Sequence, residues 1–271
     1  MIHSFDQALQ LAWQGEDLFT GHTHPAWANM VGPYGGISAA CALQAVMQHP
    51  LSLGEPVALT INYAAGLADG PYQLKARPAR TNRSTQHWVL EWLQDIDGQA
   101  QVMMTATALT AVRRTTWRAQ DLPLPEVPPP EAVPAVLMVG QVEWVKRYEM
   151  RVLRGHLPEP MDGREQDSLM QMWLRDAEHR PVDLPALAAM TDVFYPRVWL
   201  RRAHRVPAGT VSLTIYFHAG AQELAEHGHE PLLAQARSHD FRHGFFDQTS
   251  QLWSRSGLLL ATAHQIVYYK E

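Results

Sequence analysis

The sequence predicts an α+β protein made of two similar units in tandem, and an internal repeat is the first observation that supports this. The stretch from Val57 to Gly66 shares Val, Leu-Thr-Ile and Ala-Gly with the stretch from Val211 to Gly220, at identical spacing and 154 residues apart. A second match places Ala106–Ala108 155 residues before Ala261–Ala263. Two matches at nearly one offset indicate the duplication of a unit about half as long as the chain.

The composition limits the classes of function. The 271 residues, of which 46% are hydrophobic, suffice for two cores of ordinary size. The net charge is −5 and the 22 basic residues are scattered, so we expect neither a nucleic acid nor a membrane as partner. Cys41 is the single cysteine, which excludes an internal disulfide and a cysteine-rich zinc site. Without a leader-like start or an apolar run of about 18 residues, a cytoplasmic protein is expected.

The first half of the sequence predicts one long helix followed by an antiparallel series of strands. A short helix in 5–14 and a strand in 17–23 come first. The turn-rich Gly32–Gly36 then leads into the Ala-rich stretch 37–47, which stops before Pro50 and whose small side chains let a helix lie close to a sheet. Four strand-like stretches follow, over 56–65, 71–80, 85–96 and 100–112, with Asp-Gly turns at Asp69-Gly70 and Asp97-Gly98.

A proline-rich segment separates the halves. Residues 115–134 include Leu-Pro-Leu-Pro and three successive prolines, which cannot pair in a sheet and indicate an extended linker. We therefore expect an N-terminal unit over 1–114, a linker over 115–137 and a C-terminal unit over 138–271.

The second half repeats the same order of elements. Strand-like stretches at 142–152 and 169–175 precede a second helix at 184–191, for which Asp183 supplies an N-cap and Pro185 suits the first turn. Further strands are predicted over 211–220, 232–241, 245–253 and 258–269. Each half thus consists of a strand, a helix and about four more strands.

Five motifs occur in an order that resembles the acyl-CoA thioesterase II (TesB-like) family: Gly32–Gly36, Thr81–Trp88, Asp192–Pro196, Tyr216–His218 and Gly257–Gln265. The resemblance covers nearly the whole chain. It implies a double hot-dog fold, in which a sheet wraps around a central helix and the arrangement is repeated in tandem. It also implies hydrolysis of fatty acyl-CoA to free acid and CoA, without a cofactor. The corresponding expectations are an acyl-CoA substrate and a homo-oligomer, either a dimer or a tetramer.

In that family an Asp, a Thr and a Gln together orient the attacking water. Matched by motif, these residues fall on Asp192, just after the second helix, on Thr210 and on Gln265. Apolar neighbours such as Phe194 indicate partial burial of Asp192, which would raise its pKa and make the carboxylate a better base. The alternative is that Asp192 only caps the turn before Pro196.

Gln265 lies on an apolar strand face. Strict alternation in the last strand gives that face the residues Leu259, Ala261, Ala263, Gln265 and Val267. An amide buried without a partner costs about 1 to 3 kcal/mol, so we expect Gln265 to meet Asp192 or its water. The alternative partner is a backbone carbonyl.

Thr210 fits the strand pattern less well. The apolar face of its strand consists of Val211, Leu213, Ile215 and Phe217. Alternation then leaves Thr210 on the other face with Ser212 and Thr214, although the pleat need not be regular directly after Pro207–Gly209. Ser212 is the substitute if Thr210 points away, and an ordinary strand hydroxyl is the alternative for Thr210.

Gly35 and Gly36 open the first helix, where free N–H groups and the positive end of the helix dipole suit a thioester carbonyl that becomes an oxyanion. The first helix carries Leu43 and Gln44 where the second would place its acid. We therefore expect one site per chain, between the two units, with the Gly36 N–H on the carbonyl. The alternative role of the glycines is tight packing of the helix against the sheet.

Other chemistries have weaker support. The histidines of His227–His229 and His239–His243 come without a compact carboxylate or cysteine set, so we expect no metal site. The sequence has no Gly-x-Ser-x-Gly elbow, and Cys41 in its Ala-rich helix is typical of a core residue. A non-catalytic acyl-CoA-binding module and an acyl-thioester hydratase or dehydratase stay open. A dehydratase usually pairs its Asp with a His, and alternation turns His264 away from Gln265.

Overall fold

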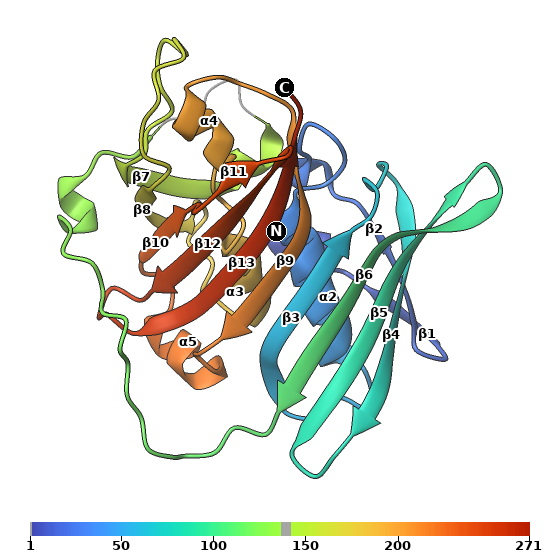
Figure 1. Ribbon diagram of the computed structural model, residues 1–271. Helices are drawn as coiled ribbons and strands as arrows, with labels where there is room; N and C mark the ends of the chain where they lie inside the picture. Colours follow the sequence, from blue (N-terminus) through green and yellow to red (C-terminus); the bar gives the residue numbers. More distant parts are fainter. Residues whose placement is uncertain (1, 137–141) are drawn as a thin grey trace.

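The computed structural model describes residues 2–136 and 142–271, and within them thirteen strands form one antiparallel sheet that passes through both halves of the chain (Figure 1). The strand order is β1-β2-β4-β5-β6-β3-β9-β13-β12-β10-β8-β7, with β11 paired to β12. The sheet curves around helix α2 in the first half and around α3 in the second (Figure 1). The predicted α+β architecture of two tandem hot-dog units is confirmed.

Most element bounds agree with the sequence expectations to within a few residues. The first half contains α1 (Ser4–Ala8), β1 (Ala12–Gly15), β2 (Leu18–His22), the 3-10 helix η1 (Pro25–Trp27), α2 (Gly35–Gln48), β3 (Glu55–Tyr63), β4 (Pro71–Thr81), β5 (Thr85–Ile96) and β6 (Gln99–Ala111). The second half contains η2 (Pro130–Ala132), η3 (Glu143–Arg147), β7 (Tyr148–Arg154), β8 (Met170–Asp176), α3 (Leu184–Met190), α4 (Arg197–Arg202), β9 (Ala208–Phe217), α5 (Ala221–His227), β10 (Leu232–Arg237), β11 (Phe241–Arg242), β12 (Phe245–Trp253) and β13 (Leu259–Tyr269).

The repeated stretches join the two units. β3 and β9 pair antiparallel with Thr60 directly opposite Thr214, and the two Oγ1 atoms lie 3.0 Å apart. These threonines occupy equivalent positions of the repeat, 154 residues apart, so the pairing is symmetrical about them. The similarity that reveals the duplication in the sequence therefore also marks the seam at which one continuous sheet forms.

The two central helices meet on the inner side of the sheet. α2 and α3 contact each other, and small residues of α2 such as Ala39 and Ala42 are completely buried, which permits close packing. α3 begins as predicted, with the Asp183 carboxylate accepting a hydrogen bond from the Ala186 N–H at 2.8 Å. One hydrophobic core contains residues of both units. The end of α3 is thereby held against the start of α2.

Several segments differ from the sequence expectations. The predicted helix in 5–14 ends at Ala8 and β1 follows within that range, and the predicted strand 232–241 is divided into β10 and β11. The stretch 142–152 was expected to be a strand, but η3 occupies its first part and β7 begins only at Tyr148. The expectations also omit α4 and α5. Pro196 is the N-cap of α4, and the Glu223 side chain caps α5 by accepting the Gly220 N–H at 2.9 Å. Short helices set by such local caps carry little periodic signal.

The proline-rich segment runs along the second unit. Residues 112–129, all of which the structure describes, form no helix or strand. Leu124 and Val127 nevertheless pack against a buried cluster that includes Trp173 and Trp253. Residues 137–141, where the predicted linker ends and the predicted C-terminal unit begins, lie outside the described residues.

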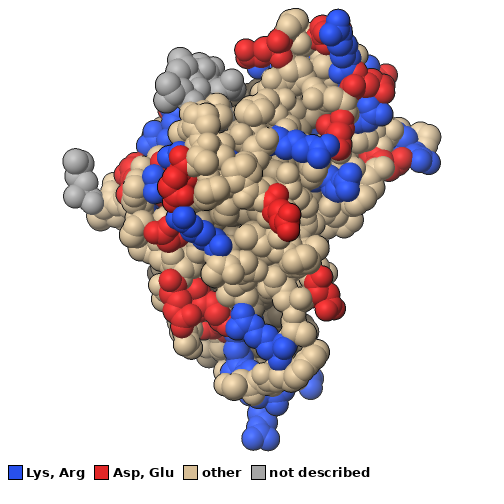
Figure 2. Space-filling model, turned by 90° about the vertical axis from the view of Figure 1, so that its left-hand side faces the viewer, with Lys and Arg blue, Asp and Glu red and all other residues tan. Residues whose placement is uncertain are grey.

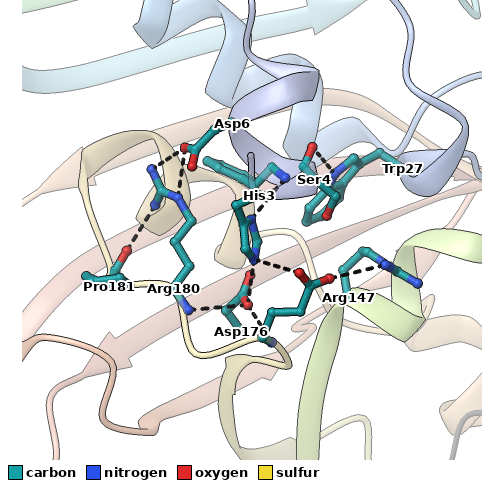
Figure 3. Close-up of polar contacts among 10 residues, drawn as sticks. His3, Ser4, Asp6, Trp27, Arg147, Asp176, Arg180 and Pro181 are labelled. Carbon is teal, nitrogen blue, oxygen red and sulfur yellow. Dashed lines mark hydrogen bonds and ion pairs between the residues drawn. The ribbon is translucent and has the colours of Figure 1, made fainter. Parts of the chain in front are cut away.

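The start of the chain reaches across to the second unit (Figure 3). His3 Nε2 lies 3.1 Å from Asp176 Oδ1, and Arg180 Nε donates to Asp6 Oδ1 at 2.9 Å. Trp27 Nε1 donates to the Ser4 carbonyl at 3.3 Å. These contacts fasten α1 between the units.

The surface carries both charge signs. On the face in Figure 2, basic and acidic side chains occur across the whole view and often side by side. In the part of the chain that the structure describes, no helix combines the length and apolar character needed to cross a membrane.

Candidate active site

Asp192 and Gln265 form the central pair of the site. Asp192 follows the last turn of α3, where its N–H donates to the Ala189 carbonyl at 3.2 Å. Gln265 comes from the inner face of β13 and is 3% exposed. Its Nε2 donates to Asp192 Oδ1 at 2.7 Å. The predicted approach of these two side chains is confirmed, although their elements lie far apart in the sequence.

The electrostatic setting of Asp192 favours a proton acceptor that works near neutrality. The residue is half-buried, and the burial of its carboxyl raises the pKa from 3.8 to about 7. The hydrogen bonds from Gln265 and from the Gly36 N–H lower the pKa and only partly offset the burial. A carboxylate with such a pKa is a far stronger base than a solvated one.

A β-bulge in β9 turns Thr210 toward this pair. Ile266 pairs with Ser212, but Val267 pairs with Thr210, so Val211 is the extra residue between them. Val211 is therefore 39% exposed, and its expected place on the apolar face is wrong. Thr210 Oγ1 instead donates to Gln265 Oε1 at 3.3 Å, while Ser212 lies on the opposite face beside the exposed Ile266. The irregular pleat that Pro207–Gly209 suggested is located at Val211.

Gly35 makes room for Asp192, and Gly36 makes room for the end of α3. A Cβ on Gly35 would come 2.8 Å from Asp192 Oδ2, and a Cβ on Gly36 would come 2.6 Å from the Ala189 carbonyl oxygen. The Gly36 N–H bonds to the Asp192 carboxylate, whereas the sequence led us to expect it on the substrate carbonyl. The close packing of α2 against α3 thus requires both glycines.

Two tyrosines that the sequence interpretation missed fix the relative position of these elements. The Tyr34 hydroxyl donates to the Ala189 carbonyl at 2.6 Å, and the Tyr63 hydroxyl donates to the Gly35 carbonyl at 2.8 Å. Burial first, and the nearby Asp192 carboxyl second, raise the pKa of both phenols well above the usual value. No sequence pattern separates a core tyrosine from one that binds a helix end.

Other candidate groups lie outside this constellation. Burial raises the pKa of the Cys41 thiol to about 11, so this cysteine is an unreactive core residue. His264 is exposed and faces Asp247 at 3.4 Å, on the side away from Gln265. Within the described residues, no group of three or more His, Cys, Asp or Glu side chains is arranged to hold a metal ion.

Comparison with known proteins agrees with this architecture. A hot-dog protein of unknown function from Alicyclobacillus acidocaldarius is 42% identical, with a TM-score of 0.93 and coverage of 100% of this chain and 99% of that one. The tesB protein of Mycobacterium avium subs paratuberculosis (19% identity, TM-score 0.76) and the acyl-CoA thioesterase II TesB2 of Mycobacterium marinum (18% identity, TM-score 0.74) share the fold, each over 98% of both chains. No curated protein matches the chain.

The fold and the comparisons define a double hot-dog thioester hydrolase. Family models match both units, the acyl-CoA thioesterase N-terminal domain over residues 23–111 and the acyl-CoA thioesterase C-terminal domain over residues 120–269. The chain belongs to the acyl-CoA thioesterase family.

Proposed function

We propose that the chain hydrolyses acyl-CoA thioesters at one site, with Asp192 as general base and with Thr210 and Gln265 as the groups that position it and its water. The observation that carries the proposal is the 2.7 Å hydrogen bond between Gln265 and a carboxyl whose pKa is raised to about 7. A general base works best when its pKa lies near the working pH.

The reaction needs one water and no cofactor. Asp192 takes a proton from the water, and the oxygen of the resulting hydroxide forms a bond to the thioester carbonyl carbon. The carbonyl oxygen carries negative charge in the tetrahedral intermediate. When that intermediate collapses, the carbon–sulfur bond breaks, and the proton held by Asp192 passes to the CoA thiolate. The products are the free acid and CoA, and Asp192 is again a carboxylate.

Thr210 acts through Gln265. Its hydroxyl donates to Gln265 Oε1, which turns the amide so that Nε2 faces Asp192. The oriented amide then holds one carboxylate oxygen, Oδ1, and fixes the orientation in which the carboxylate accepts the proton of the water. Thr210 is in this view a positioning residue.

The organisation of the chain fits one site. We propose units over 1–114 and 138–271 joined by the linker 115–137, with the acid supplied by the second unit alone. The start of α2 from the first unit contributes the glycines and tyrosines around Asp192. Acyl-CoA would thus bind where the two units meet.

The test is hydrolysis of a panel of acyl-CoAs of increasing chain length, followed by reaction of the released CoA with a thiol reagent. Wild type should turn over at least one class, and Asp192→Asn should lose about 10²- to 10⁴-fold in kcat, the range that a general base contributes. Unchanged turnover in Asp192→Asn would disprove the assignment. Binding without turnover would favour an acyl-CoA-binding module, and hydration of an enoyl-CoA without thiol release would favour a hydratase.

A further inference from the structure

Gln248 is a second glutamine on the inner face beside the Asp192–Gln265 pair. It lies on β12 directly opposite Gln265 of β13, so the two side chains stand on the same face. Cβ atoms of such cross-strand neighbours are about 4.5 to 5.5 Å apart. Gln248 is 3% exposed, as is Gln265. Its amide can therefore reach a group that is bound next to Gln265.

The Gln248 amide differs from the other buried glutamines in having no hydrogen-bond partner among the residues that the structure describes. The Gln86 amide accepts from the Leu53 N–H and donates to the Leu51 carbonyl, each at 2.9 Å. Gln94 is similarly paired through its side-chain oxygen and nitrogen. Buried amides are normally paired in this way. The Gln248 amide is also not among the described polar atoms that are sealed from solvent without a partner, so it can bond water or a bound ligand.

Most other hydrogen-bond donors around Asp192 are already used, with the buried Tyr148 hydroxyl, which also feels the charge of Asp176, as a further donor that has no partner in the described part of the chain. The Gly36 N–H bonds to the Asp192 carboxylate, and the Thr210 hydroxyl donates to Gln265. Three further hydroxyls donate to backbone carbonyls, namely those of Tyr34, Tyr63 and Ser250. A thioester carbonyl bound beside Gln265 would find two free N–H groups on Gln248.

We propose that Gln248 Nε2 donates a hydrogen bond to the carbonyl oxygen of the bound thioester and stabilises the oxyanion during hydrolysis. The inference rests on the proposed function, because it needs a thioester held next to Asp192 and Gln265. A neutral amide suits this task, since it supplies a fixed donor without adding a charge that would compete for the Asp192 carboxylate. Gln248 is then a catalytic residue that touches the substrate.

The test compares Gln248→Met with Gln94→Met. Methionine has nearly the shape of glutamine and no N–H group. Gln248→Met should lower kcat about 100-fold, the loss expected for one oxyanion donor, with a small change in KM. Its Tm should stay equal or rise, because no hydrogen bond of the folded chain is lost.

Gln94→Met is the matched control. Gln94 accepts the Ala68 N–H at 2.8 Å and donates to the Ala68 carbonyl at 2.9 Å, so both bonds join β5 to the segment between β3 and β4. Its loss should lower Tm and leave kcat of the folded enzyme unchanged.

Asp192→Asn, measured in parallel, distinguishes a failure of the proposed role of Gln248 from a failure of the proposed function. Full activity of Gln248→Met beside an inactive Asp192→Asn would overturn the role of Gln248 and keep the proposed function. A clearly lower Tm of Gln248→Met would also overturn it, because the amide would then have a structural role. Full activity of Asp192→Asn would remove the proposed function itself.

Discussion

Replacement of Asp192 by asparagine should make the fold more stable at alkaline pH. Burial holds the pKa of this carboxyl at about 7 instead of 3.8. At 1.36 kcal/mol per pKa unit, the gap corresponds to about 4 kcal/mol of folding free energy as an upper bound. Because Asp192 is half-buried and reaches solvent, we expect about 1 to 3 kcal/mol.

The direction of this stability change with pH follows from proton binding. The folded chain holds the Asp192 proton more tightly than the unfolded chain, so the stabilisation is complete below about pH 4 and is lost as the pH rises to about 7. Asparagine does not titrate and resembles the protonated carboxyl. The variant should therefore keep a stability that the wild type loses over this range.

Urea unfolding at about pH 5 and about pH 8 measures the effect. The free energy of unfolding of Asp192→Asn relative to wild type should increase by about 1 to 2 kcal/mol between the two pH values. Gln94→Met serves as control. Neither glutamine nor methionine titrates, so this variant should be destabilised equally at the two pH values. If the difference in free energy of unfolding between Asp192→Asn and wild type stayed constant or decreased with pH, the raised pKa of Asp192 would be refuted.

Three further substitutions test the surroundings of Asp192. Gln265→Met removes the hydrogen bond that lowers the Asp192 pKa, so kcat should fall at least about tenfold and the acid limb of the pH–rate profile should move to higher pH; an unmoved limb would contradict the contact. Gly35→Ala puts a methyl group 2.8 Å from Asp192 Oδ2 and should lower kcat. Gly209→Ala, whose added methyl group meets nothing within 4 Å, should not. Equal effects of the two substitutions would contradict the need for a glycine beside Asp192. Thr210→Val keeps the shape and removes the donor to Gln265, so kcat should fall roughly tenfold with little change in Tm, and Thr210→Ser should restore most of it.

The sequence could predict the architecture because its signals are local or repeated. The Val57 and Val211 stretches revealed the duplication, and alternation correctly placed Gln265 inside and His264 outside. Alternation failed at Val211, because a bulge changes the phase of a strand and leaves no mark in composition. The prediction for Thr210 therefore depended on family resemblance and not on periodicity.

The remaining features of the site depend on contacts between distant elements. The hydrogen bond of the Gly36 N–H to Asp192 and those of Tyr34 and Tyr63 join α2, α3 and β3. A single sequence holds no signal for such pairings. Gln248 could have been noticed as an amide on an apolar face, by the same reasoning that identified Gln265, but only the structure places it directly opposite Gln265.

The most direct test of the central claim is the pH dependence of kcat for acyl-CoA hydrolysis, measured on wild type and on Asp192→Asn. A base with a pKa of about 7 predicts that wild-type kcat rises with pH and levels off above neutrality, with an apparent pKa near that value. The folded Asp192→Asn enzyme should show only a low residual rate without this limb. A wild-type profile that is flat through neutrality, or an Asp192→Asn variant with the same profile and rate, would contradict Asp192 as the base.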